Sequence, residues 1–162
     1  MDFYYAVKDP GAADARGGYL EKMYGAVPES FPAVVRAYYA SVEGLKAKHA
    51  RDLFPKLGHV NRAIALFHGL VETSPDNVEI RFLRYALFSQ LPFFFGVRSY
   101  ISTDLSAIVD QLEARRYDEV PLDIQQAIVV YLLANAPLDR AARARLQEVA
   151  AGGQESRPGP LR

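Results

Sequence analysis

The chain has 162 residues, of which 50% are apolar and 23% charged, which suits one globular domain with a substantial core. Its 19 basic and 19 acidic residues give a formal net charge of zero, so binding to nucleic acid through bulk charge is not expected. The absence of cysteine excludes disulfides, thiol catalysis and thiolate metal sites, and leaves the redox compartment undetermined.

Residues 1–27 contain several tyrosines but little helical periodicity. Gly17 and Gly18 should interrupt a helix there, since each glycine weakens a helix interior by about 1 kcal/mol. The N-terminus has no signal-peptide pattern. The longest apolar run, 127–134, is too short to span a bilayer. We therefore expect a cytoplasmic protein without an integral membrane segment, although a trimmed secreted or periplasmic chain would look the same.

The next part of the chain predicts two helices joined by a turn. The first helix is expected to begin at Ser30, a favourable N-cap, and to end at Pro55. The turn is then expected at 54–58, and the second helix at 57–73. Apolar residues recur at helical spacing in both segments.

The segment that follows is the most informative one. Asp76, with Glu79 three residues later, is typical of a capping box at a helix start. The helix from there to Pro92 is apolar on nearly every face, which indicates burial. Arg81 and Arg84 lie inside it, and a buried guanidinium stays charged and needs paired acceptors. The segment therefore predicts an internal polar network.

The rest of the chain predicts a connector, 93–99, and three more helices. Thr103 or Asp104 is expected to cap the first of them. The second, 121–134, is apolar all round and should be central. An amphipathic helix follows Pro137.

No strand pattern longer than a few residues occurs in the sequence. The expected fold is all-α, with about six or seven helices packed as antiparallel, tetratricopeptide-like hairpins in a row. One helical domain is expected over 1–151. A flexible tail, 152–162, should follow, because its polar composition offers almost no core residue.

The helix before Asp76 resembles the second half of a tetratricopeptide repeat, in which an alanine and an aromatic four residues later precede a proline. Those places are held by Ala63, Phe67 and Pro75. Phe54 stands where the first helix of the repeat carries its tyrosine. The places of the family's Trp, Leu and Gly are taken by Ala47, Ala50 and Arg51, and only Ala127 and Tyr131 echo the pattern later. The resemblance implies one tetratricopeptide-like helix pair rather than an array.

A second resemblance covers residues 76–104. Positions 77–84 read Asn-Val-Glu-Ile-Arg-Phe-Leu-Arg. This is similar to a group of small bacterial helical proteins that share Asn-x-Glu-Ile-Arg-Phe-Leu-Arg, then Pro-x-Phe-Leu-Gly-Tyr and an acidic helix start. Phe95 and Val97 replace the Leu and Tyr of the second motif, and Asp104 holds the acidic position. The resemblance implies a helical fold and no particular activity.

The arginine pair is the first candidate site. Arg81 and Arg84 are neighbours on one helix surface, so they could grip the carboxylate or phosphate of a ligand. The alternative, which we favour, is internal pairing with Glu79, Asp104 or Asp110. The expected structural network comprises Glu79, Arg81, Arg84 and Asp104.

The histidines His49, His59 and His68 lack metal-ligand spacing, and a metal site would need Asp52 or Glu72 to join them across helices. No metal and no cofactor are expected. The sequence contains no phosphate-binding or nucleophile-elbow motif, and no catalytic residue is assigned, although sequence does not exclude a triad assembled in space.

Exposed aromatic side chains are the other candidates. Phe93–Phe95 either plug the end of the core or meet a partner groove or membrane, and Phe94, the middle one, is expected to face outward. The spacing of Tyr38 with Val34 and Val42 places it inward, so Tyr39, roughly 100° further round the helix, is expected to be exposed.

The first functional interpretation is a non-enzymatic adaptor or scaffold that binds a protein or peptide through exposed aromatics and arginines. Its candidate binding residues are Tyr39, Arg81, Arg84, Tyr85, Phe94 and Arg98. The second is a small-ligand-binding protein or enzyme with an inter-helix pocket near Arg81, Arg84 and Tyr85. A third, peripheral membrane binding through Phe93–Phe95, has less support because no basic amphipathic surface accompanies these residues.

Overall fold

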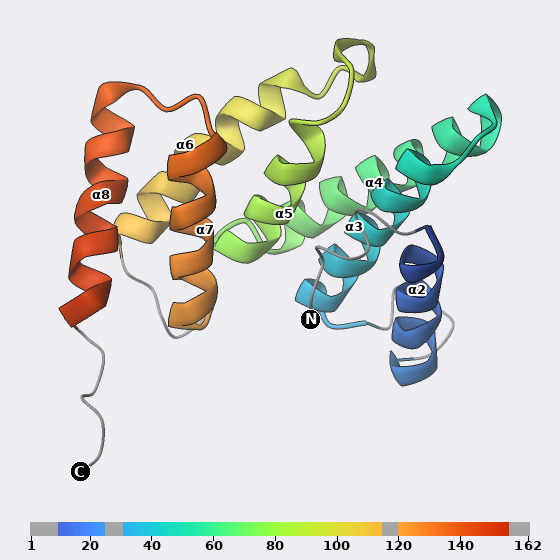
Figure 1. Ribbon diagram of the computed structural model, residues 1–162, viewed down its shortest axis with the longest axis horizontal. Helices are drawn as coiled ribbons and strands as arrows, with labels where there is room; N and C mark the ends of the chain where they lie inside the picture. Colours follow the sequence, from blue (N-terminus) through green and yellow to red (C-terminus); the bar gives the residue numbers. More distant parts are fainter. Residues whose placement is uncertain (1–9, 25–30, 115–119, 156–162) are drawn as a thin grey trace.

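The computed structural model describes residues 10–24, 31–114 and 120–155, and the regular structure in these ranges is entirely helical (Figure 1). Seven α-helices and one 3₁₀ helix are present there, so the all-α prediction is confirmed. Their bounds are α2 (Pro10–Tyr24), α3 (Ala33–His49), α4 (Leu53–Thr73), α5 (Val78–Phe88), η2 (Phe93–Phe95), α6 (Arg98–Glu113), α7 (Leu122–Asn135) and α8 (Arg140–Glu155).

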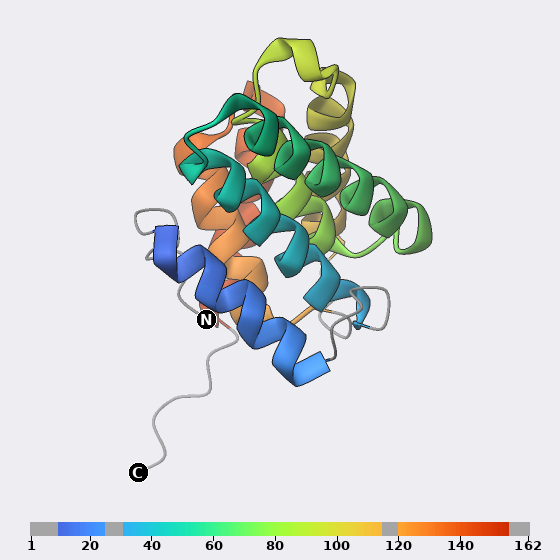
Figure 2. The same ribbon diagram turned by 90° about the vertical axis from the view of Figure 1, so that its right-hand side faces the viewer.

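The helices form antiparallel hairpins arranged in a row. α3 pairs with α4, α5 with α6, and α7 with α8 (Figure 1). α5 also packs against α3 and α7, and α6 packs against α8, so each hairpin contacts the next. α2 covers the free side of α3 at one end, and Figure 2 shows α2, α3 and α4 side by side in that order. No helix of the described ranges is both long enough and apolar enough to cross a bilayer.

Two large apolar clusters meet at α5. One lies between α3, α4 and α5 and includes Ile80 and Phe88. The other lies between α5, α6, α7 and α8 and includes Val78 and Tyr85. Because α5 contributes to both, its sequence is apolar on nearly every face, as its burial requires. A third, smaller cluster joins α2 to α3.

The prediction for α7 is wrong in one respect. Its sequence is apolar all round, but Val130 is largely exposed, and only one side of the helix enters the core. α7 packs against α8 and α5 near the end of the row, and no helix of the described ranges covers its outer face.

The prediction that Gly17 and Gly18 interrupt the N-terminal segment is also wrong, since α2 runs through both. Gly17 is buried against α3, and a Cβ there would lie 3.2 Å from Lys46 Nζ and 3.6 Å from Val42 Cγ1. Close packing on α3 therefore offsets the low helix propensity of the glycines.

The turn between α3 and α4 lies earlier than predicted. α3 ends at His49, and Ala50 is extended, with φ −63° and ψ 130°. Pro55 does not end a helix but sits in the first turn of α4, where a backbone amide is not needed for helix hydrogen bonds. The predicted N-cap Ser30 lies outside the described residues.

The starts of α5 and α6 differ from prediction as well. Asn77, not Asp76, caps α5, because its Oδ1 accepts a hydrogen bond of 3.0 Å from the Ile80 amide. α6 begins at Arg98, so Thr103 and Asp104 lie inside the helix instead of capping it. At the other end of the chain, α8 continues through Glu155 and includes the first residues of the predicted tail, whereas 156–162 are outside the described part.

Candidate functional site

A buried carboxylate, Asp104 of α6, lies at the centre of the arginine network. Arg84 Nε donates to Asp104 Oδ2 and Arg84 Nη2 to Oδ1, both at 2.7 Å. Arg81 Nη1 donates to Oδ1 at 2.9 Å. Asp104 is 0% exposed, and Arg84 is buried with it. The sequence offered Glu79, Asp104 and Asp110 as acceptors. Asp104 accepts hydrogen bonds from both guanidinium groups, and the pair with Arg84 is bidentate.

Arg81 makes a second link on the same side of α5. Its Nε donates to the carbonyl oxygen of Pro75, in the turn before α5. Gln111 Nε2 of α6 donates to that carbonyl at 3.2 Å. The two arginines therefore link α5 to α6 and to the turn before α5, and the hydrogen bonds they donate here stay within the protein.

Aromatic rings complete the surroundings of Arg84. Its Cζ lies 5.3 Å from the ring centre of Tyr100 and 5.9 Å from that of Phe88, which are cation–π distances. The ring of His68, on α4, meets Tyr100 edge-on at 4.4 Å. This cluster joins α4, α5 and α6. The sequence did not reveal Tyr100, and His68 was weighed only as a metal ligand. Tyr100 stands four residues before Asp104, a helical spacing that becomes visible only once α6 is known to begin at Arg98.

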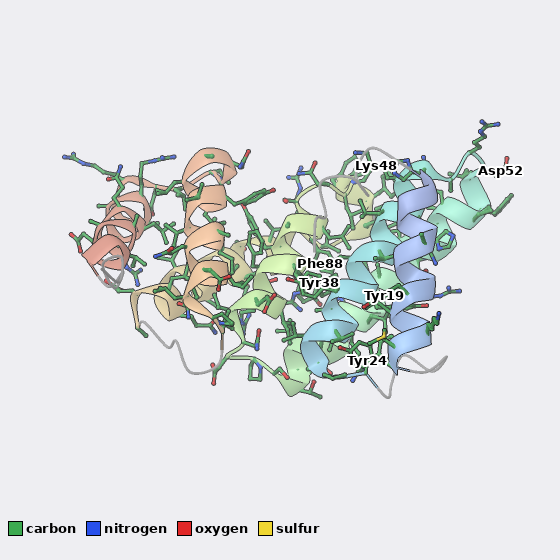
Figure 3. All side chains as sticks on the ribbon, turned by 60° about the horizontal axis from the view of Figure 1, so that its bottom comes forward. Tyr19, Tyr24, Tyr38, Lys48, Asp52 and Phe88 are labelled. Carbon is green, nitrogen blue, oxygen red and sulfur yellow. The ribbon has the colours of Figure 1, made fainter. Side chains whose placement is uncertain are left out.

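Glu79 does not join this network. It lies two positions before Arg81 and therefore on the other side of α5, where the Tyr38 hydroxyl donates to its Oε1 at 2.5 Å. Burial raises the pKa of Tyr38, and hydrogen bonding to the Glu79 carboxylate raises it further. Figure 3 shows Tyr38 between α3 and α5. Glu79 thus links α5 to α3.

A third buried carboxylate, Glu43, links α3 to α4. Glu43 Oε2 lies 2.9 Å from His59 Nδ1 and 3.2 Å from Arg62 Nη1, while Oε1 lies 3.1 Å from Lys46 Nζ. Burial alone would raise the pKa of Glu43, but its contacts with His59 and Lys46 outweigh burial and hold the pKa below its usual value. Spacing within α3 reveals only the pairing of Glu43 with Lys46, because His59 and Arg62 lie on α4.

In the described ranges, no three residues among His, Asp and Glu come together in a way that could hold a metal ion. His59 instead contacts Glu43, and His68 meets the Tyr100 ring edge-on.

The connector between α5 and α6 presents exposed aromatic rings. Phe93 is 73% exposed and Phe94 65% exposed, whereas Phe95 packs against the cluster between α3, α4 and α5. Neighbouring ring centres lie 6.1 Å apart for Phe93–Phe94 and 4.7 Å apart for Phe94–Phe95. Arg98, another sequence candidate, is exposed at the start of α6. Phe94 therefore faces outward, as predicted, and Phe93 does so with it.

The expectation for Tyr39 is wrong. This side chain is only 7% exposed and meets Phe31 edge-on at a ring distance of 5.8 Å. Leu20 of α2 belongs to the same cluster, so α2 covers the face of α3 that the sequence analysis left open. Tyr38 is half-buried.

Tyr85 faces a pocket that the arginines do not reach. The pocket has a volume of about 420 Å³ and is lined by Tyr85, Ser89, Gln90, Ile101, Tyr131, Asn135 and Pro137. Its lining contains hydroxyl and amide groups but no charged side chain. Burial and then the nearby Tyr131 raise the pKa of Tyr85. Arg81 and Arg84 are instead held by Asp104.

Comparisons of the chain with protein-family models, with curated proteins and with solved structures found no match.

Proposed function

We propose that this protein is a non-enzymatic interaction module, an adaptor or scaffold in which tetratricopeptide-like hairpins hold an aromatic connector toward a protein or peptide partner. The observation that carries the proposal is the joint exposure of Phe93 and Phe94 on one short turn. Adjacent exposed aromatics are typical of binding hot spots. Arg81 and Arg84, by contrast, are engaged inside the fold.

The connector suits a binding role because its shape is fixed before a partner arrives. The Phe95 amide donates to the Pro92 carbonyl at 3.2 Å, and the Gly96 amide donates to the Phe93 carbonyl at 3.1 Å. Gly96 adopts φ 70°, a left-handed conformation that favours glycine, and Phe95 anchors the turn in the core. A preorganised turn loses little conformational entropy on binding.

The test is photo-crosslinking in the native host with a benzoylphenylalanine residue at position 94 or, as the control, at 130. Val130 is 67% exposed on α7 and lies outside the connector. We expect a discrete crosslinked protein or peptide from position 94 and none from 130.

Binding to the captured partner is then measured for two alanine variants. Phe94→Ala should weaken binding by at least about 1–2 kcal/mol, with little change in thermal stability, and Val130→Ala should leave binding unchanged. Equal binding by both variants would place the interface elsewhere.

Small-ligand binding is the second candidate function, and the pocket beside Tyr85 is the observation that favours it. Because its lining is polar but uncharged, the ligand class would be a neutral molecule rich in hydroxyl or amide groups. A thermal-shift screen of such compounds should give hits that Tyr131→Ala abolishes and Val130→Ala retains. A screen without such hits would argue against this function.

A further inference from the structure

The turn between α3 and α4 concentrates positive charge in a chain whose net charge is zero. Between positions 46 and 59 there are four basic residues and one acidic residue, namely Lys46, Lys48, Arg51, Lys56 and Asp52. Lys46 is paired with Glu43. Lys48, Arg51 and Lys56 have no ion-pair partner among the residues that the structure describes. These three cations are available to an external partner.

Two apolar side chains form the apex of the same turn. Leu53 and Phe54, the first residues of α4, are 64% and 85% exposed. Pro55 beside them is also exposed. Figure 1 places this turn at the outer end of the α3–α4 hairpin, and Figure 3 shows Asp52 at the end of the molecule opposite α8. The apex is therefore free to approach a flat surface.

We propose that this basic, apolar tip binds the surface of an anionic lipid membrane. Leu53 and Phe54 enter the interfacial region, while Lys48, Arg51 and Lys56 lie against the lipid phosphates. Apolar residues with cations on both sides of them in the sequence match the two layers of such a surface, which are acyl chains below and negative headgroups above. This function is separate from partner binding at the connector between α5 and α6.

Charge distinguishes this tip from the other exposed apolar turn. From Ser89 to Ser99 the connector contains a single charged residue, Arg98. The connector therefore lacks the cations that hold a protein on an anionic surface, whereas the α3–α4 tip has them. A bare nucleic-acid backbone would satisfy the cations of the tip but leave Leu53 and Phe54 in water, so a lipid surface accounts for more of the observed side chains.

The first experiment is co-sedimentation of the full chain with vesicles of phosphatidylcholine alone or of an equal mixture of phosphatidylcholine and phosphatidylserine. We expect binding to the mixed vesicles only, weakened by added salt. Lys48→Gln and Arg51→Gln should each weaken it about fivefold, the effect of one cation near such a surface. Asp52→Asn should strengthen it, because it removes the single acid of the tip. Phe94→Ala, at the connector, is the control and should bind as wild type does.

A second experiment separates insertion from charge attraction alone. The chain contains no tryptophan, so Phe54→Trp introduces one reporter at the apex. Its fluorescence should shift to the blue and become shielded from a water-soluble quencher when mixed vesicles are added. The variant with both Leu53→Ser and Phe54→Ser should lose most of its vesicle binding while its circular dichroism stays unchanged.

Three results would overturn the proposal. They are no binding of the wild type to mixed vesicles, an unshifted tryptophan on bound vesicles, and full binding by the double serine variant. An unshifted tryptophan or full binding by the double serine variant would mean that charge alone holds the protein on the vesicle, without insertion of the side chains at positions 53 and 54.

Discussion

Replacing Arg84 by alanine tests whether the Asp104 cluster is structural. The change removes both hydrogen bonds of the bidentate pair, each 2.7 Å long, and leaves a fully buried carboxylate with one remaining bond from Arg81. It also removes the guanidinium from above the Tyr100 ring. Breaking one side of a buried ion pair costs about 3–5 kcal/mol. Because Arg81 still contacts Asp104, we expect the lower end, about 3 kcal/mol.

The assay is equilibrium unfolding in urea followed by circular dichroism, with the free energy of unfolding extrapolated to water. Arg145→Ala is the matched control, since Arg145 also contacts two carboxylates, Asp110 and Glu113, but in an exposed pair. Arg145→Ala should lower the free energy of unfolding by less than about 1 kcal/mol. A further comparison is Arg84→Ala in an Asp104→Asn background, where the loss should be smaller because no buried charge is stranded.

Ordinary surface substitutions change the free energy of unfolding by no more than about 0.5 kcal/mol. A change of that size for Arg84→Ala would refute a structural role for the buried pair of Arg84 and Asp104. So would a loss equal to that of Arg145→Ala. Either result would return Arg84 to the set of candidate ligand-binding residues.

Two more predictions concern α3. A Cβ on Gly44 would collide with Leu87 Cδ1 of α5, so Gly44→Ala should lower the free energy of unfolding by about 1–3 kcal/mol. Gly58 of α4 is the control, because a Cβ there meets open space, and Gly58→Ala should raise the free energy of unfolding by up to about 1 kcal/mol. Both variants are measured by unfolding in urea. The fold lowers the pKa of Glu43 below its ordinary value of 4.5. The ionised Glu43 carboxylate therefore stabilises the fold fully above about pH 4.5, and this contribution is lost as the pH falls through the lower pKa of the folded state. The stability difference between wild type and Glu43→Gln should therefore shrink as pH falls through that range; a pH-independent difference would contradict the pairing with His59.

Local features of the sequence were enough to predict the fold class. Helical periodicity and the proline at position 121 located α7 within one or two residues. The apolar segment with two arginines was rightly expected to be buried and paired, because a charged guanidinium inside a core has few options. These arguments need no knowledge of which helices become neighbours.

The errors came from contacts between distant segments. Asp104 has the residue type of an N-cap, yet it lies inside α6 because two arginines of α5 satisfy its carboxylate. Tyr39 was expected outside because the helical spacing of Tyr38 placed Tyr38 inward, but spacing within α3 does not reveal that α2 covers Tyr39. Pro55 was taken as a helix end, which hid the exposed Leu53–Phe54 apex at the helix start.

Buried carboxylates link neighbouring helices and so favour one register of each pair. Apolar packing tolerates swaps of similar volume at a cost below about 1.5 kcal/mol. A register slip that separated a buried acid from its partner would cost about 3–5 kcal/mol. Glu43 links α3 to α4, Glu79 links α5 to α3, and Asp104 links α6 to α5.

Between α7 and α8, the described residues include no buried acid. The contacts there include a large apolar cluster and a 3.0 Å hydrogen bond from Arg143 Nη1 to the Leu133 carbonyl. α3 to α6 therefore form the part of the molecule that buried acids join. Both proposed surfaces, the connector and the basic tip, are turns within that part. We therefore expect the positions of the two proposed surfaces relative to each other to depend on Glu43, Glu79 and Asp104, none of which lies in either surface.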